Sequence, residues 1–312
     1  MRFLIVGAGA LGGYYGGMLI EGGADVTFLV RPRRAAQLAE RGLIIRTPDS
    51  EFAMPVKTVK AGAVGGPYDV VFLTCKAFDL DSAIDDFAPA LANDGAVLPV
   101  LNGINHIETL SDRLGAARVL GGVVIFLVSV TPEGDIAVPG FGTGQTSFGE
   151  LTGEHSARCE SIRAALSAGG VESRISDDIV AEMWGKYCGM AASATIATLT
   201  RARAGEVAAT SAGAGFAAAV YDECARIGTA AGQSPATTMG MRDIVLGLWK
   251  QAGSTYGPFI IFDIENGRPT EGEHIIGDLV RRADHLGVDA PILRAALCNL
   301  QVYEARRRAS GA

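Results

Sequence analysis

The segment Gly7–Gly12 reads GAGALG and constrains the fold more than any other part of the chain. It fits the pattern Gly-x-Gly-x-x-Gly, and it directly follows the apolar run Phe3–Val6, which is typical of a buried parallel strand. A helical segment, Gly9–Glu21, comes next and ends at Gly22. In this context the glycines allow a tight turn, close approach of a pyrophosphate and close packing of helix on strand. The pattern predicts that the helix N-terminus binds dinucleotide phosphates through Gly7, Ala8, Gly9, Ala10, Leu11 and Gly12.

Strand-like and helical segments alternate over the first half of the chain. Further strand-like runs are Asp25–Val30, Tyr68–Cys75 and Ala96–Leu101, with helical segments between them. From Asp177 onward the apolar periodicity is almost only helical. We therefore predict an α/β, Rossmann-type N-terminal domain with a doubly wound parallel sheet over residues 1–176. An all-α domain is predicted over residues 177–312.

Composition and charge restrict the possible partners. The 312 residues are comfortable for two domains, and the net charge of -7 with no long basic stretch disfavours nucleic acid. Five scattered cysteines and four histidines show no metal-ligand spacing, so no metal site is expected. Glycines interrupt the apolar N-terminus, which disfavours a signal peptide, and the run Val119–Val130 is too short to span a bilayer. We expect a cytoplasmic protein that binds small molecules and neither nucleic acid nor membrane.

The residues after the second strand bear on the choice of cofactor. An acidic residue there would hydrogen-bond the ribose 2′-hydroxyl of NAD, but this sequence has Val30-Arg31-Pro32-Arg33-Arg34. Guanidinium groups suit a phosphate dianion through bidentate hydrogen bonds. The sequence thus predicts NADP(H), with Arg31 on the 2′-phosphate and Arg33 or Arg34 in support. A solvated basic turn is the alternative interpretation.

Two polar residues stand at the ends of predicted strands. Lys76 follows Thr74-Cys75, and Asn102 follows Leu101. Ligands of open parallel sheets bind beyond the carboxyl ends of the strands, so both residues are candidates for the site. A solvated lysine and an Asn-Gly turn are the structural alternatives.

The chain also resembles the ketopantoate reductases (2-dehydropantoate 2-reductases) over nearly its whole length. The matching pieces are Gly7–Gly12 with Arg31, Thr74–Ala77, Asn102-Gly103, Trp184-Gly185-Lys186 and Asp263–Glu271. The resemblance implies NADPH-dependent reduction of a 2-keto acid, as in the conversion of ketopantoate to pantoate in pantothenate biosynthesis.

The resemblance also implies roles for individual residues. Lys186 would be the general acid that stabilises the developing alkoxide, and Glu271 its acidic partner. Asn102 would orient the substrate carbonyl and the nicotinamide, and Lys76 would add positive charge near cofactor and substrate carboxylate. A lysine extending from a helix to solvent and an acid at a helix N-terminus are the structural alternatives.

Three positions depart from the family pattern. Met190 and Ala194 stand where asparagines follow the lysine by one and two helical turns, and Phe259 stands where the family has a substrate-binding serine. Met190 and Ala194 follow Lys186 by four and eight residues and so share its helix face. We therefore expect the wall of the substrate site beside Lys186 to be apolar. We predict a substrate that contacts these positions and is bulkier or less polar than ketopantoate.

Two other functions fit the same pattern. One is an NAD-dependent D-2-hydroxyacid dehydrogenase of the same superfamily, against which Arg31 argues. The other is a non-catalytic NADP-binding regulator, against which Lys186 and Glu271 argue. The apolar helical half also makes a homodimer the expected assembly.

Overall fold

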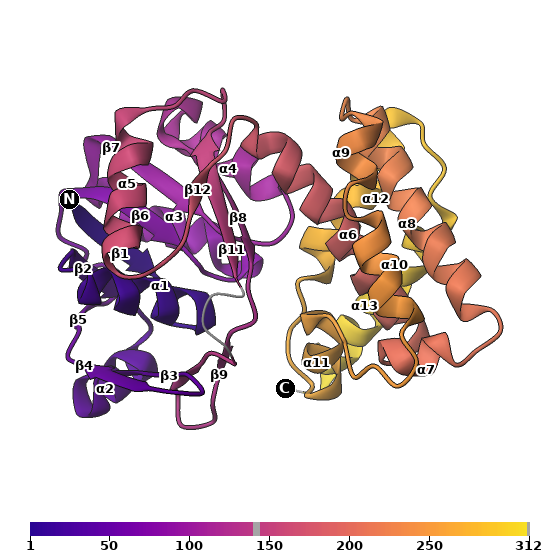
Figure 1. The fold of residues 1–312 in the computed structure, drawn as a ribbon, viewed down its shortest axis with the longest axis horizontal. Coiled ribbons are helices and arrows are strands. Elements are labelled where there is room, and N and C mark those ends of the chain that lie inside the picture. Colours follow the sequence, from indigo (N-terminus) through magenta and orange to yellow (C-terminus); the bar gives the residue numbers. More distant parts are fainter. Residues whose placement is uncertain (140–143, 311–312) are drawn as a thin grey trace. The chain divides into compact units, whose positions relative to one another are not determined.

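The computed structural model describes residues 1–139 and 144–310 (Figure 1). The chain packs as two compact units, of which the first contains Met1–Leu101 and His106–Val180, and the second Asn102–Asn105 and Ala181–Ala312. Helix α6 (Ile179–Thr200) begins at the end of the first unit and supplies residues of the second. The short segment Asn102–Asn105 therefore packs with helices that follow it by more than seventy residues.

The first unit is built on a five-stranded sheet. Its strand order is β5-β2-β1-β6-β7, and every neighbouring pair is parallel. β1 lies at the centre, so Val6 at its carboxyl end pairs with Leu29 on one side and Leu73 on the other. The strands are β1 (Arg2–Val6), β2 (Asp25–Leu29), β5 (Lys57–Val59), β6 (Tyr68–Leu73) and β7 (Leu91–Pro99).

Alternate residues of the strands face two different hydrophobic layers. Phe3 and Ile5 pack with α1 (Ala10–Glu21) and α5 (Ala157–Ala168), which cover one face of the sheet in Figure 1. Leu4 and Val6 pack into a second cluster, which includes apolar residues of α3 (Leu80–Phe87) and α4 (Asn105–Leu114). Burial on both faces explains why these strands read as continuous apolar runs. The predicted doubly wound parallel sheet is confirmed.

The later strands of this unit differ from the prediction. The apolar run Val119–Val130 predicts one strand, but β8 (Leu120–Ile125) ends before β9 (Ser129–Val130), which belongs to another sheet. β8 pairs antiparallel with β11 (Gln145–Glu150), and β11 pairs parallel with β12 (Arg174–Ile175). The third sheet has the order β4-β3-β10-β9, with β3 (Leu43–Arg46), β4 (Glu51–Met54) and β10 (Ile136–Ala137). These strands are short and partly polar, and the sequence pattern did not indicate them.

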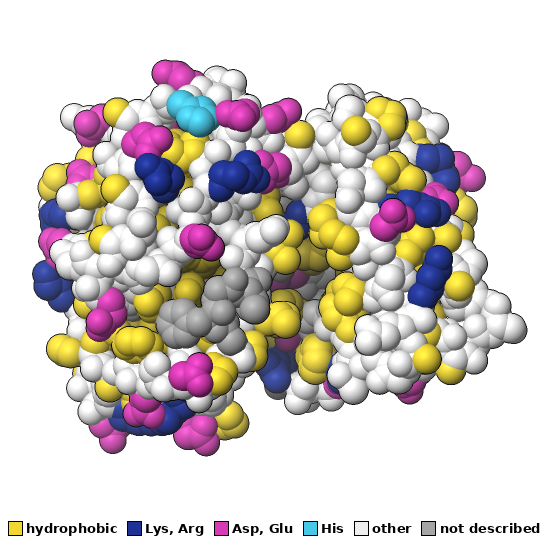
Figure 2. Space-filling view, in the orientation of Figure 1, with side chains coloured by type: hydrophobic (Ala, Val, Ile, Leu, Met, Phe, Trp, Pro, Cys, Tyr) yellow, Lys and Arg dark blue, Asp and Glu magenta, His cyan; other side chains and the backbone are white. Residues whose placement is uncertain are grey.

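Short helices complete the first unit between its strands. They are α2 (Pro32–Arg41), η1 (Ala77–Asp79), η2 (Ala88–Ala90) and η3 (Ala116–Arg118). Acidic and basic side chains are interspersed over the face of this unit seen in Figure 2, and no large area of one sign gathers there.

The regular elements that the structure describes in the second unit are helices, which confirms the predicted all-α organisation. The apolar periodicity of Thr237–Trp249 predicts one helix, whereas the structure has two short helices there, separated by Gly240 and Met241. None of the helices in the described ranges combines the length and apolar character needed to cross a bilayer. The remaining elements are α7 (Ala204–Ala208), α8 (Gly213–Ala230), α9 (Pro235–Met239), α10 (Arg242–Lys250), α11 (Phe259–Glu265), the π-helical segment η4 (Glu273–Gly277), α12 (Asp278–Leu286) and α13 (Pro291–Ala309).

A buried carboxylate joins two of these helices. Glu223 of α8 is only 2% exposed, and its Oε1 accepts a hydrogen bond of 2.8 Å from the backbone N–H of Leu293. The N–H of Ile292 lies 3.4 Å from Oε2. These amides belong to the first turn of α13, where helical N–H groups have no partner within the helix. Glu223 thus caps α13 from a neighbouring helix.

Replacing Glu223 with alanine is expected to lower the free energy of unfolding by about 1–3 kcal/mol, because buried amides lose their acceptor. Glu223→Gln keeps a carbonyl oxygen in place and should cost less. Urea unfolding followed by circular dichroism measures both. A Glu223→Ala protein as stable as the wild type would contradict the proposed cap.

Candidate active site

The glycine loop between β1 and α1 is held by close backbone packing. Gly7 has a φ of 96°, a conformation that side-chain-bearing residues rarely adopt. A Cβ at Gly12 would lie 2.0 Å from the carbonyl oxygen of Gly7 and 2.4 Å from Oγ1 of Thr74. The Thr74 hydroxyl donates to the carbonyl oxygen of Val6 at 2.8 Å. Helix α1 therefore begins directly against the ends of β1 and β6.

Gly9 differs from the other two glycines, because a Cβ built there would meet no atom within 4 Å. It borders a cavity of about 630 Å³ at the carboxyl ends of β1, β2 and β6. Open space beside free helix N–H groups suits a pyrophosphate. The side of the cavity formed by the glycine loop comprises Val6, Gly7, Ala8 and Gly9.

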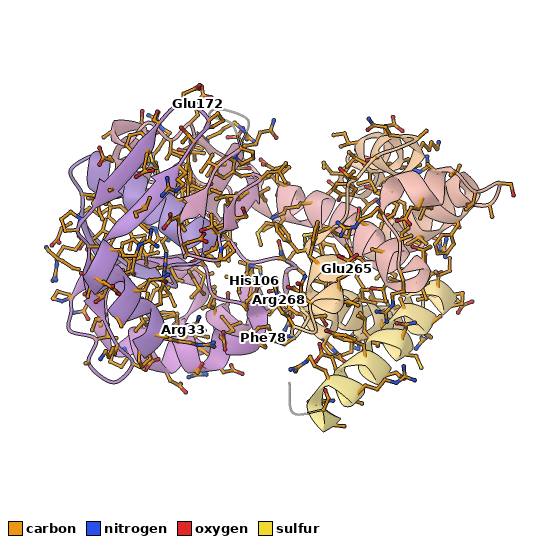
Figure 3. The ribbon with its side chains drawn as sticks, turned by 90° about the horizontal axis from the view of Figure 1, so that it is seen from below. Arg33, Phe78, His106, Glu172, Glu265 and Arg268 are labelled. Carbon is orange, nitrogen blue, oxygen red and sulfur yellow. The ribbon has the colours of Figure 1, made fainter. Side chains whose placement is uncertain are left out.

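The three predicted arginines play different structural roles. Arg31 lines the cavity with a side chain that is 76% exposed, and its Nη2 donates to Oδ1 of Asp79 at 2.6 Å. Arg34 also lines the cavity, and its Nε donates to the carbonyl oxygen of Ala8 at 3.0 Å. Arg33 is exposed at the start of α2 (Figure 3). Arg34 is thus the arginine that connects α2 with the glycine loop.

The cavity has polar residues that the sequence pattern did not single out. Asp79 follows Lys76 by three residues, and together with Ser82 and Asp86 it lines the cavity beside Arg31. Lys60, after β5, lies on the same wall. The sequence does contain a signal for Asp79, because this acidic residue stands only three positions after Lys76 at the end of a predicted strand. Lys76 itself is exposed, and the lining residues from its segment are Cys75 and Asp79.

In the second unit, α6 and the segment before η4 bring Lys186 and Glu271 into electrostatic contact. Lys186 is half-buried in α6, and burial lowers the pKa of its ammonium to about 8. The Glu271 carboxylate acts in the opposite direction and raises that pKa. A lysine with a pKa of about 8 can donate a proton at near-neutral pH, and it can also remain a cation beside developing negative charge. The electrostatic interaction between Lys186 and Glu271 agrees with the predicted pairing of these two residues.

Tyr187 contacts the segment that follows Glu271, and the sequence pattern did not single it out. It is fully buried, and two acceptors share its hydroxyl proton: the carbonyl oxygen of Ile275 at 2.8 Å and Oδ2 of Asp278 at 2.9 Å. Ile275 belongs to η4, which begins two residues after Glu271. π-helical turns are rare and frequent at functional sites. A buried tyrosine next to Lys186 thus anchors the segment that carries Glu271.

His274 connects Asn102 with the same segment. Its ring lies against Gly103, where an added Cβ would come within 3.0 Å of Cδ2 and Nε2. The backbone of Asn102 forms a hydrogen bond with the ring, and burial lowers the pKa of His274. A neutral imidazole therefore holds the Asn102–Asn105 segment against η4. Asn102 packs in the unit that contains Lys186 and Glu271, whereas Lys76 belongs to the sheet unit.

The three positions that depart from the family pattern have different surroundings. Met190 is partly exposed, one turn after Lys186 on α6. Ala194, one turn further, is 1% exposed and packs inside the unit. Phe259 begins α11 and is 57% exposed. Met190 and Phe259 thus offer apolar surface, and substrate contact at all three positions stays a prediction.

Comparisons with known proteins agree with this organisation. Residues 3–153 match the family described as ketopantoate reductase PanE/ApbA, and residues 178–304 match its C-terminal domain. An uncharacterized oxidoreductase of Bacillus subtilis, YkpB, is 35% identical over 98% of this chain and 100% of its own length. A 2-dehydropantoate 2-reductase of Archaeoglobus fulgidus is 27% identical over 95% of each chain.

Solved structures share the fold over nearly the whole chain. The 2-dehydropantoate 2-reductase of Geobacter metallireducens has a TM-score of 0.86 and 27% identity, and covers 96% of this chain and 99% of its own. A D-mandelate dehydrogenase solved with NADH and anilino(oxo)acetate has a TM-score of 0.87 at 22% identity, over 99% of this chain and 100% of its own. At that identity the second likeness concerns the fold.

Sheet, glycine loop and helical second unit together define an oxidoreductase with a Rossmann-type N-terminal domain. The chain belongs to the ketopantoate reductase PanE/ApbA family, as its motifs predicted.

Gly12→Ala and Gly9→Ala are expected to differ sharply in stability. The added methyl at Gly12 overlaps the Gly7 carbonyl, so the free energy of unfolding should fall by about 1–3 kcal/mol. The methyl at Gly9 meets open space, and that variant should remain within about 0.5 kcal/mol of the wild type. Chemical denaturation measures both, and equal losses would contradict the described loop packing.

Lys186 is expected to titrate near pH 8, well below an ordinary lysine. The other lysines of the chain are Lys57, Lys60, Lys76 and Lys250, so carbon-13 NMR of the lysine Cε groups can follow each, with Lys186→Arg assigning the signal. Because Glu271 raises this pKa, Glu271→Gln should move the midpoint to lower pH. A midpoint unaffected by Glu271→Gln would remove the inferred coupling.

Proposed function

We propose that this protein is an NADP(H)-dependent reductase that converts a 2-keto acid with an apolar substituent into the 2-hydroxy acid. The observation that carries the proposal is the Lys186 ammonium, whose pKa burial lowers to about 8 beside Glu271. An amine with this pKa suits protonation of a carbonyl oxygen during reduction. Membership of the ketopantoate reductase family supports the reaction class.

The cavity of the first unit fits a dinucleotide. Gly9 leaves room for the pyrophosphate, and Arg31 and Arg34 place two guanidinium groups on the wall that follows β2. Nη2 of Arg34 is buried and, among the described residues, has no hydrogen-bond partner, so it is a donor available to an anionic ligand. Gly7–Gly12, Arg31 and Arg34 would hold the cofactor, and the family resemblance adds Lys76 and Asn102 as cofactor contacts. When bound, a reduced nicotinamide supplies the hydride for the carbonyl carbon.

The chain's own residues account for the remaining steps. Lys186 donates a hydrogen bond to the carbonyl oxygen of the substrate and transfers its proton as negative charge develops there. Glu271 raises the pKa of this ammonium and so keeps it protonated at neutral pH. Asn102, held through its backbone by His274, orients the carbonyl with its side-chain amide.

The preference for an apolar substrate rests on two apolar positions, one partly exposed and one exposed. Met190 presents a thioether one turn after Lys186, and Phe259 presents a ring at the start of α11. Sites that hydrogen-bond a substrate hydroxyl discriminate strongly, and they lose that discrimination when the polar partner is absent. Branched or aromatic 2-keto acids are therefore the proposed substrates, in preference to ketopantoate.

Oxidation of NADPH with a panel of 2-keto acids tests the proposal. Aromatic or branched compounds should give the highest kcat/KM, and Lys186→Ala should lower kcat by about 100-fold or more, because a transition-state contact is lost. Lys250→Ala, an exposed lysine of α10, is the matched control and should retain wild-type activity. A clear preference for ketopantoate would overturn the substrate assignment, and full activity of Lys186→Ala would overturn the mechanism.

A further inference from the structure

The ion pair between Arg31 and Asp79 lies where the dinucleotide's ribose would be recognised. Arg31 follows β2 and begins α2, whereas Asp79 follows β6 and begins α3. β1 lies between these two strands, so the 2.6 Å pair crosses the end of the strand that leads into the glycine loop. Both side chains line the cavity that contains Gly7 and Gly9. Arg33 and Phe78, labelled in Figure 3, are neighbours of this pair in the sequence and mark the two segments.

We infer that Asp79 is a specificity-determining residue that weakens the preference of this pocket for NADP(H) and allows NAD(H) to bind as well. The inference rests on the proposed function, because it concerns the same cofactor site. Arg31 is the predicted ligand of the 2′-phosphate, and its Nη2 is already bonded to a carboxylate.

The two cofactors place opposite demands on this pair. A 2′-phosphate dianion needs the donors of Arg31 and is repelled by a carboxylate nearby. An unphosphorylated ribose has a 2′-hydroxyl, which donates a hydrogen bond to a carboxylate, as the acidic residue of NAD-binding Rossmann domains does. Asp79 therefore weakens the interaction of Arg31 with the 2′-phosphate of NADP(H), and its carboxylate can accept a hydrogen bond from the 2′-hydroxyl of NAD(H). The acid comes from the segment after β6 and not from the end of β2, where sequence patterns place it.

The side chains around Asp79 differ in charge and exposure, and Lys60 adds one cation to this wall. Asp79 is 29% exposed in its side chain, so solvent screens it less than it screens Arg31. Asp86 lines the same cavity and accepts a hydrogen bond from the backbone N–H of Gly62 at 3.3 Å. Arg34 is bound to neutral acceptors, which are the Ala8 carbonyl, the Gln37 amide oxygen at 2.7 Å and the Gly134 carbonyl at 2.8 Å. Among the described residues, Arg34 has no direct carboxylate contact and remains available for phosphate, while Arg31 is shared with Asp79.

Asp79→Asn tests the inference, because it removes the charge, keeps the shape, and takes away no side-chain cap from α3. Dissociation constants for NADPH and NADH are measured by nucleotide fluorescence without substrate. The ratio of the NADH constant to the NADPH constant should rise by about 3- to 30-fold, as expected for the loss of one nearby like charge. Arg31→Ala should lower the same ratio. Asp79→Ser repeats the charge removal with a different side chain.

Asp81→Asn is the matched control, since Asp81 is an exposed acid of α3 outside the cavity-lining set. It makes the same change in net charge and should leave the ratio within twofold of the wild type. If the wild type binds both nucleotides and neither Asp79 variant changes the ratio, the role of Asp79 is overturned and the proposed reductase stands. If the wild type binds neither nucleotide, the proposed function fails together with this inference.

Discussion

The structure depends on the close packing of α1 against the ends of β1 and β6. Gly12 has room only for a hydrogen where α1 meets the Gly7 carbonyl and the Thr74 hydroxyl. That contact sets the position of the first free N–H groups of α1, and these groups border the cavity through Gly9. A side chain at Gly12 would separate helix from strand and displace the anion-binding end of the helix. The nucleotide pocket is therefore a consequence of backbone contact more than of any single polar side chain.

The second unit holds a partly buried lysine amine among its helices. Burial lowers the pKa of Lys186, and Glu271 limits that shift. The position of Glu271 depends on η4, which Tyr187 and Asp278 tie to α6 and α12. His274 adds the segment that carries Asn102. Three candidate catalytic residues, far apart in the sequence, are thereby connected through hydrogen bonds and packing within one unit.

The cofactor pocket is lined by both basic and acidic side chains and is not a simple basic patch. Arg31 and Arg34 both follow β2, yet they bond to different partners: Arg31 to the Asp79 carboxylate, and Arg34 to neutral acceptors. A basic cluster read from sequence alone indicates phosphate binding, because it takes no account of acids that arrive from another strand. The identity of the cofactor thus depends on the net interaction of both signs at one wall of the cavity.

The sequence by itself determined the Rossmann-type sheet, the glycine loop, the helical second half and the family, because local periodicity and short motifs carry these features. It also predicted the pairing of Lys186 with Glu271 through the resemblance. It missed the strands β3, β4, β5 and β10, which are short and partly polar, and it joined β8 to β9 because their apolar run is nearly continuous. Only the tertiary structure showed three hydrogen bonds: Arg31 with Asp79, Tyr187 with η4, and the Asn102 backbone with the His274 ring. These contacts join residues separated by 48, 88 and about 170 positions, and no local pattern records which distant side chain will occupy a given neighbourhood.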